Sequence, residues 1–175
     1  MCAVDAAYKG DRVVAVASVF EDGRPAGKSS YAGWCSLPYV SGLFYLHEGP
    51  FVVEAVRRLE VRPQLLCFDA HGAAHPRSAG LATVCGMVLG VPSAGIAKSL
   101  LVGRVVTGRG DPARVVHGGR TVGFAVETDG VARYWSAGYS VGLRELRFVI
   151  QMYARVCLQA MSEADREARE RVRSA

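Results

Sequence analysis

An acid and two histidines follow directly on a short apolar run. Residues 69–76, Asp-Ala-His-Gly-Ala-Ala-His-Pro, come after Leu65-Leu66-Cys67-Phe68, which is typical of a buried strand. Ligands of open α/β sheets bind outside the carboxyl ends of the strands, where a carboxylate is costly to desolvate unless a cation or hydrogen-bond donors neutralise it. We therefore expect Asp69 to be a metal ligand.

Two further carboxylates could join Asp69. Asp5 interrupts the apolar strand Cys2-Ala3-Val4-Asp5-Ala6-Ala7, although a structural ion pair or an edge position explains a lone strand acid equally well. Glu48 precedes Gly49-Pro50, where a helix can begin, and helix capping alone accounts for it. If the three acids converge, they suit Mg²⁺, with Mn²⁺ as a substitute, better than zinc. Phosphodiester hydrolysis is the reaction that such a site favours.

A lysine and a histidine are candidates for supporting roles. Lys98 ends the strand Ser93 to Ala97 and is one of three lysines, so it is either a surface residue or a contact to the scissile phosphate. His75 precedes Pro76, which restricts its backbone, and we expect it to support the metal site or transfer a proton. His71 is expected to bond to backbone in a loop.

A rigid apolar loop and several glycines could contact a flat ligand. Tyr39, at the tip of Pro38-Tyr39-Val40-Ser41-Gly42, either covers the core or acts as a wedge between bases. Gly42, Gly72 and Gly80 would let the backbone approach a ligand closely, but turns and helix packing explain each glycine separately.

The elements that must position these residues alternate in type. The pattern predicts three strands joined by short turns, a helix opened by Pro50, a strand, a helix, a strand, a mobile basic loop, a hairpin and a long helix from Leu143. Their predicted bounds are 2–8, 12–20, 28–36, 50–62, 64–68, 76–89, 93–97, 103–119, 122–127 with 131–136, and 143–160.

This order predicts an α/β fold. Short links make the first three strands an antiparallel meander, and strand-helix-strand implies a parallel pair with a right-handed crossover. We expect a ribonuclease H-like mixed sheet with helices on both faces and with the first and fourth strands as neighbours. Residues 1–161 are predicted to form one domain, and residues 162–175, which alternate acids and Arg, a solvated helical tail.

Composition limits the class of protein. A chain of 175 residues with 50% hydrophobic residues can bury one core, and its five cysteines include no Cys-x-x-Cys pair. No apolar stretch is long enough to cross a membrane, and no signal peptide is evident, so we expect a cytoplasmic monomer. The net charge of +5, carried by eighteen Arg and three Lys, modestly favours nucleic acid as the partner.

Several motifs together closely resemble the endonuclease V family. They are Asp5-x-x-Tyr8, Pro38-Tyr39-Val40-Ser41-Gly42 with His47-Glu48-Gly49-Pro50, Asp69-x-His-Gly-x-x-His75-Pro76-Arg77, Gly80-Leu81-Ala82, and Val91-Pro92-Ser93-Ala94-Gly95-Ile96-Ala97-Lys98. Their order and spacing are far more specific than any one motif, and they cover most of the chain to about Leu101.

The resemblance implies a Mg²⁺-dependent DNA repair endonuclease that recognises hypoxanthine, the deamination product of adenine. It would cut the second phosphodiester on the 3′ side of the lesion and leave 3′-hydroxyl and 5′-phosphate ends. Asp5, Glu48 and Asp69 match the metal-binding acids, and His75 and Lys98 match supporting catalytic positions. Substrate-binding matches are the wedge Tyr39 and the pocket glycines Gly42 and Gly80, to which we add Gly72.

Some positions depart from the family pattern, and two other functions stay open. The family usually has Pro, Arg, Gly, Lys and His where this chain has Ser41, His47, Ala70, Ser99 and Tyr139. No departure removes a metal-binding acid, so activity is expected. The alternatives are an endoribonuclease for inosine in single-stranded RNA, and a binder of deaminated bases without catalysis.

Overall fold

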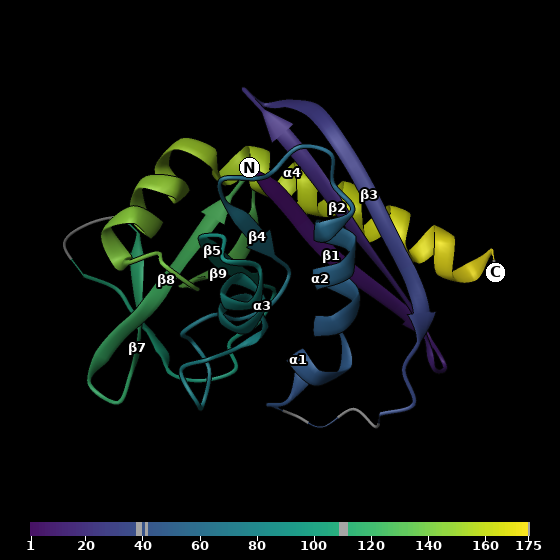
Figure 1. The fold of residues 1–175 in the computed structure, drawn as a ribbon. Helices are drawn as coiled ribbons and strands as arrows, with labels where there is room; N and C mark the ends of the chain where they lie inside the picture. Colours follow the sequence, from purple (N-terminus) through teal and green to yellow (C-terminus); the bar gives the residue numbers. More distant parts are fainter. Residues whose placement is uncertain (38–39, 41, 109–111, 175) are drawn as a thin grey trace.

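The computed structural model describes residues 1–37, 40, 42–108 and 112–174. Within these residues one mixed sheet has nine strands in the order β3-β2-β1-β4-β5-β9-β8-β7-β6. Helices cover both faces of this sheet (Figure 1). The architecture confirms the predicted ribonuclease H-like α/β fold.

The first three strands form the predicted meander. β1 (Cys2–Lys9) pairs antiparallel with β2 (Arg12–Glu21), and β2 pairs antiparallel with β3 (Arg24–Trp34). Most of β2 is buried on both of its faces, because helices pack on each side of it. β1 is therefore held in a fixed register close to the centre of the sheet.

The centre of the sheet is parallel. β4 (Leu66–Phe68) lies between β1 and β5 (Ser93–Ala97) and runs parallel to both. The crossover from β4 to β5 contains α3 (Leu81–Leu89). This arrangement confirms that the first and fourth strands are neighbours, and it brings the residues that follow β4 close to β1.

Four antiparallel strands complete the other side of the sheet. β9 (Val131–Ala137) pairs with β5 and with β8 (Arg120–Thr128), followed by β7 (Ala113–His117) and β6 (Arg104–Val106). The predicted hairpin is confirmed, but the mobile loop predicted over 103–119 is wrong where β6 and β7 form. The arginines of this segment favoured a loop, whereas its valines, of which Val115 is fully buried, are the residues that stabilise strands.

Short helices cover one face of the sheet. α1 (Phe44–His47), which was not predicted, leads into α2 (Gly49–Arg57), which begins at Gly49-Pro50 as expected, and both lie with α3 on this face. The helix predicted from Pro76 begins only at Leu81. The preceding residues form turns, with Ser78 in the left-handed region at φ 51°.

A single long helix covers the opposite face. α4 (Leu143–Arg173) crosses the sheet and contacts β1, β2, β8 and β9 (Figure 1). It continues without interruption past residue 162, so the predicted tail is helical but is not fully solvated. Ala164 and Ala168, one turn apart, are buried and form a small cluster with Val16. Among the described residues, no helix is long and apolar enough to cross a membrane.

Candidate functional site

Three aspartates from distant parts of the chain meet at the centre of the fold. Asp5 lies on β1, Asp69 directly follows β4, and Asp165 lies on α4. One carboxylate oxygen from each side chain lies within 4.8 Å of the others, an arrangement that could hold a metal ion. The predicted convergence is therefore found for Asp5 and Asp69, with Asp165 as an unpredicted third member.

Strand alternation places two of these acids. Ala3 packs in the cluster under α4, whereas Val4 packs in the cluster on the opposite face, so Asp5 faces α4 as Ala3 does. The N–H of Asp69 donates to the carbonyl oxygen of Val4 at 3.2 Å, which extends the parallel pairing beyond β4. Asp69 is thus fixed beside Asp5.

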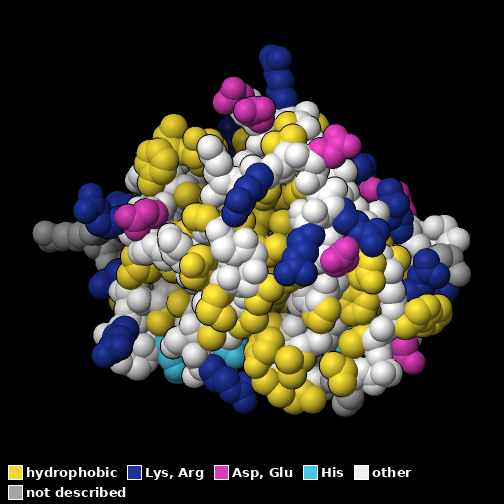
Figure 2. Space-filling view, viewed as in Figure 1, with side chains coloured by type: hydrophobic (Ala, Val, Ile, Leu, Met, Phe, Trp, Pro, Cys, Tyr) yellow, Lys and Arg dark blue, Asp and Glu magenta, His cyan; other side chains and the backbone are white. Residues whose placement is uncertain are grey.

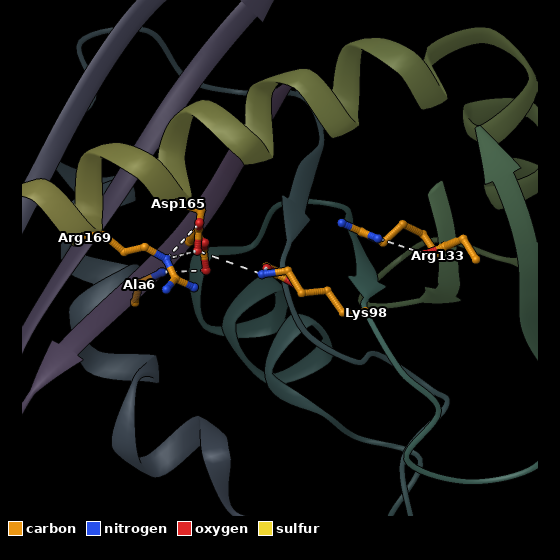
Figure 3. A network of polar contacts seen from close by, with 8 residues as sticks. Ala6, Lys98, Arg133, Asp165 and Arg169 are labelled. Atoms are coloured by element: carbon orange, nitrogen blue, oxygen red, sulfur yellow. Dashed lines mark hydrogen bonds and ion pairs between the residues drawn. The ribbon is translucent and has the colours of Figure 1, made fainter. Parts of the chain in front are cut away.

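Two cations partly neutralise the aspartates. Lys98 Nζ lies 2.5 Å from Asp69 Oδ2 and 3.9 Å from Asp165 Oδ1, and Arg169 Nε donates to both oxygens of Asp165 at 2.9 Å (Figure 3). Burial opposes the charge of Lys98, but its hydrogen bond to Asp69 raises the pKa of Lys98 above its usual range. Burial likewise opposes the charge of Asp165, and the hydrogen bond from Arg169 lowers the pKa of Asp165.

The two cations do not fully neutralise the aspartates. Burial, followed by repulsion from Asp69, raises the pKa of Asp5 to about 8. Oδ1 of Asp5 accepts the N–H of Ala6 at 2.8 Å, but Oδ2 is buried without a hydrogen-bond partner among the described residues. A buried oxygen without a partner is costly, and a divalent cation would satisfy it. The residues present therefore fit a hard metal ion.

Glu48 lies nearby but outside the group of aspartates. It sits between α1 and α2 and is only 5% exposed. Burial raises the pKa of Glu48 to about 9, and repulsion from Asp5 and Asp69 contributes to the rise. Glu48 is thus electrostatically coupled to the aspartates, and its predicted role as a metal ligand stays a prediction.

The ring of His75 bonds to two backbone segments. Its Nδ1 accepts the backbone N–H of Arg77 at 3.2 Å, and its ring also bonds to the backbone of Gly42. Arg77 Nη1 donates to the carbonyl oxygen of Gly42 at 2.8 Å. Burial, followed by repulsion from Arg77, lowers the pKa of His75, so the ring is neutral near pH 7. These contacts tie the loop at Gly42 to the segment after β4.

A cavity of about 250 Å³ opens beside Asp69. Its walls combine apolar side chains with backbone and a few polar groups. The lining includes Gly42, Tyr45, Asp69, His71, His75, Gly80, Leu81, Lys98 and Ser99. Two of the glycines that were expected to contact a ligand are thus on its wall.

Gly72 is not among the residues that line the cavity. A Cβ atom there would come 2.1 Å from the carbonyl oxygen of Ala137, so glycine is needed for packing against the end of β9. The N–H of Gly72 donates to Ser136 Oγ at 2.8 Å. The ligand contact predicted for Gly72 stays a prediction, and the one predicted for Tyr39 lies outside the described residues.

Asp165 is an acid that was not predicted to belong to the site. Its place in the sequence is among the alternating charges of the expected tail. The available signal was the pair of alanines at 164 and 168, whose spacing of four marks a buried stripe that places Asp165 at its edge. That stripe fixes the acid against β1.

Comparison with known proteins gives consistent matches. The family model described as Endonuclease V matches residues 1–162. The endonuclease V of Geotalea uraniireducens is 38% identical over 176 residues, which covers 95% of this chain and 75% of the relative. That of Desulfurococcus amylolyticus is 39% identical over 152 residues, which covers 85% of this chain and 68% of the relative.

Solved structures match over nearly the whole chain. The crystal structure of endonuclease V from Streptomyces avermitilis superimposes with a TM-score of 0.88 at 29% identity, covering 99% of this chain and 81% of that one. Endonuclease V from Ciona intestinalis, solved with a 24mer DNA containing an inosine followed by a ribo-adenosine, has the same fold, with a TM-score of 0.82 at 18% identity. The match covers 99% of this chain and 85% of that one.

Proposed function

Because the chain belongs to the endonuclease V family, we propose that it is a divalent-metal-dependent endonuclease specific for hypoxanthine in DNA. It cuts the second phosphodiester on the 3′ side of the lesion and leaves 3′-hydroxyl and 5′-phosphate ends. The observation that carries the proposal is the meeting of Asp5, Asp69 and Asp165 beside a cavity lined in part by glycines.

The aspartates are the proposed metal ligands, with Glu48 as a further acid close to them. Mg²⁺ fits this all-oxygen set, and Mn²⁺ is its natural substitute. A bound divalent ion would acidify the attacking water and screen the charge that develops on the phosphate. Asp5 contributes its unpartnered Oδ2, and Asp165 is held in place by Arg169.

Lys98 is the proposed contact to the scissile phosphate. Its ammonium group bonds to Asp69 and lies at the edge of the cavity, and its side chain is 53% exposed. When a cation neutralises the aspartates, Lys98 is freed from Asp69 to donate to a phosphate oxygen. His75 acts as a positioning residue, because its ring bonds to the backbone of Arg77 on one side and of Gly42 on the other and so joins these two segments.

The cavity is the proposed pocket for the flipped base. A base read outside the duplex needs a narrow slot with main-chain groups that can bond to its edge. Gly42 and Gly80 both line the cavity, and the residues Ala70 and His71 contribute wall next to Asp69. The inosine in the DNA bound by the Ciona relative makes hypoxanthine the first base to test.

The proposal is tested with an end-labelled DNA strand that contains one hypoxanthine. With Mg²⁺, we expect a single nick at the second phosphodiester 3′ of the lesion, and no nick after chelation of the metal. The matched strand with adenine stays intact. An RNA strand of the same sequence reveals any preference for ribose.

An Asp69→Asn variant is the control for contaminating nucleases. It keeps the size of the side chain and removes the charge that binds both the metal and Lys98. Equal cleavage of the hypoxanthine and adenine strands, or cleavage that Asp69→Asn leaves unchanged, would contradict the proposed function. Tight binding of the lesion without any cleavage would favour the non-catalytic alternative.

A further inference from the structure

A second, smaller hollow adjoins the aspartates on the side of α4. It measures about 120 Å³, about half the volume of the proposed base cavity. Asp69, Lys98 and Asp165 form the side that it shares with the metal-binding group, and Arg133 and Ser162 form the polar part of the rest. Any group bound here lies directly beside the proposed metal.

Arg133 reaches this hollow from β9. It lies two residues before Trp135, whose side chain packs in the cluster under α4, so strand alternation turns Arg133 toward α4 as well. Leu158 and Met161 of α4 form the apolar part of the wall. In Figure 3 the cationic ends of Arg133 and Lys98 point in the same direction, toward the side on which Asp165 lies.

The guanidinium of Arg133 differs from the other two cations of the site. Lys98 and Arg169 are each paired with an aspartate. Arg133 Nη1 donates to the carbonyl oxygen of Ala132 at 2.9 Å, and no carboxylate of the described residues lies within ion-pair distance of it. Arg133 is partly buried, and its bond to the neighbouring carbonyl oxygen is exposed, so this positive charge lines the hollow without an anionic partner among the described residues.

We infer that Arg133 binds a backbone phosphate of the substrate strand, the one next to the phosphate that is cleaved. The planar fork of a guanidinium matches two phosphate oxygens, and the hydroxyl of Ser162 is a further donor in the same hollow. Because the hollow shares Asp69 and Lys98 with the cleavage site, the phosphate that it accepts adjoins the scissile one. This inference rests on the proposed function.

The residue is tested by charge removal with a matched control. Arg133→Met keeps a long side chain in the lining beside Leu158 and Met161 and removes its charge, and we expect it to bind the hypoxanthine strand about tenfold more weakly than the wild type. The slope of log affinity against log salt should fall by about 0.7 to 0.9, the value for one lost phosphate contact. Arg24→Met removes an exposed arginine at the start of β3, outside both hollows, and should change neither quantity.

The phosphate is identified by neutralising it in the DNA. Strands with a single methylphosphonate at each position flanking the cut are bound in Ca²⁺, which we expect to support binding without turnover. One neutral position should weaken binding by the wild type about tenfold and leave Arg133→Met unaffected. The wild-type measurements alone show which phosphate is contacted. The loss of affinity caused by the methylphosphonate should be intermediate in Arg133→Lys, because lysine keeps the charge but lacks the planar guanidinium.

Two results would overturn the inference while leaving the proposed function intact. One is cleavage by the wild type together with unchanged affinity and salt slope in Arg133→Met. The other is an equal methylphosphonate effect in both proteins. Failure of the wild type to cut hypoxanthine DNA would instead contradict the proposed function itself.

Discussion

Asp165 is the residue on which the proposed metal site depends most directly. It is the one aspartate of the three supplied by α4, and it is held by Arg169 and Lys98. Removing a residue that only supports a metal ligand typically weakens metal binding ~10- to 100-fold. Because Asp165 is itself a proposed ligand, we expect Asp165→Asn to weaken Mn²⁺ binding by at least this factor and to lower the rate of cleavage. Isothermal titration with Mn²⁺ measures the first effect, and the strand-nicking assay the second.

The control for Asp165→Asn is Asp129→Asn. Asp129 is an exposed aspartate whose partner is Arg155, and neither residue lines the cavity or the smaller hollow. The Asp129→Asn variant should therefore bind Mn²⁺ as tightly as the wild type. Wild-type affinity in Asp165→Asn would mean that α4 does not contribute a ligand.

The raised pKa values predict how pH acts on the protein without metal. Burial raises the pKa of Asp5 from 3.8 to about 8 and that of Glu48 from 4.5 to about 9. Folding therefore favours the protonated form of both acids. Their contribution to the stability of the metal-free protein is fully present below about pH 4 and is lost as pH rises through 8 to 9. A divalent metal requires ionised acids, so its stabilisation should grow over the same range.

Thermal unfolding with and without Mg²⁺ measures this dependence. The increase in midpoint caused by Mg²⁺ should be small near pH 5 and large near pH 9. In Asp5→Asn, which carries no titrating group at this position, the dependence on pH should be reduced. An increase that is independent of pH in the wild type would contradict the assignment of buried acids as the ligands.

At the scale of elements, the turn before α3 shapes the cavity. Gly80 lies in extended backbone at the start of α3, and a Cβ atom there would come 2.2 Å from the carbonyl oxygen of His71. Gly80→Ala must therefore displace the segment that carries Asp69 and His71. We expect a loss of ~2–3 kcal/mol in the free energy of unfolding and a strong reduction in cleavage.

Urea unfolding measures the change, with Gly27→Ala as the control. Gly27 is an exposed strand glycine, and a Cβ atom added there would meet no other atom within 4 Å, so its substitution should be close to neutral. If Gly80→Ala were as stable and as active as Gly27→Ala, the close packing of Gly80 against the carbonyl oxygen of His71 would not be needed for stability or cleavage.

The last turns of α4 are expected to be part of the domain. Ending the chain after Met161 would remove Asp165 and Arg169 and expose Val16, which Ala164 and Ala168 cover. We expect the shortened protein to lose ~2–4 kcal/mol of stability and to gain none of the stabilisation by Mg²⁺ that the full chain shows. Unaltered metal-dependent stabilisation would instead support the separate tail at 162–175 that the sequence predicted.

Elements with a strong local pattern could be predicted from the sequence. The valine-rich β2 and the hairpin around Asp129-Gly130 carry their own signals, and β5 has the predicted bounds. β6 and β7 were not predicted because their valines are spaced among arginines and glycines. These strands are stabilised by pairing with each other, which the local sequence pattern does not indicate. Asp5 and Asp69 could be placed because each lies on a strand or directly after one, whereas Asp165 depends on where a helix packs.

The whole molecule brings the proposed site together between two cores. One cluster joins α2 and α3 to the sheet, and the other joins α4 to the opposite face. Asp5 and Asp69 lie where the parallel pairing of β1 and β4 ends, and Asp165 reaches them from the second layer. The three aspartates therefore meet only when both layers are in place, so we expect metal affinity also to report on global folding.

Charge is distributed over the molecule in a way that suits a nucleic acid. The chain has a net charge of +5, and Figure 2 shows Lys and Arg side chains spread over the face that carries α1, α2 and α3, among apolar side chains and several Asp and Glu side chains. Such a surface attracts a phosphate backbone without reading its sequence. Specificity would then come from the cavity beside Asp69.

The most direct test of the central claim is a crystal of the protein soaked with Mn²⁺ and examined for anomalous scattering. We predict a peak between the carboxylates of Asp5, Asp69 and Asp165, with Lys98 moved away from Asp69. A peak at another place on the protein, or no peak in crystals of an enzyme that needs Mn²⁺ to cut hypoxanthine DNA, would contradict the claim.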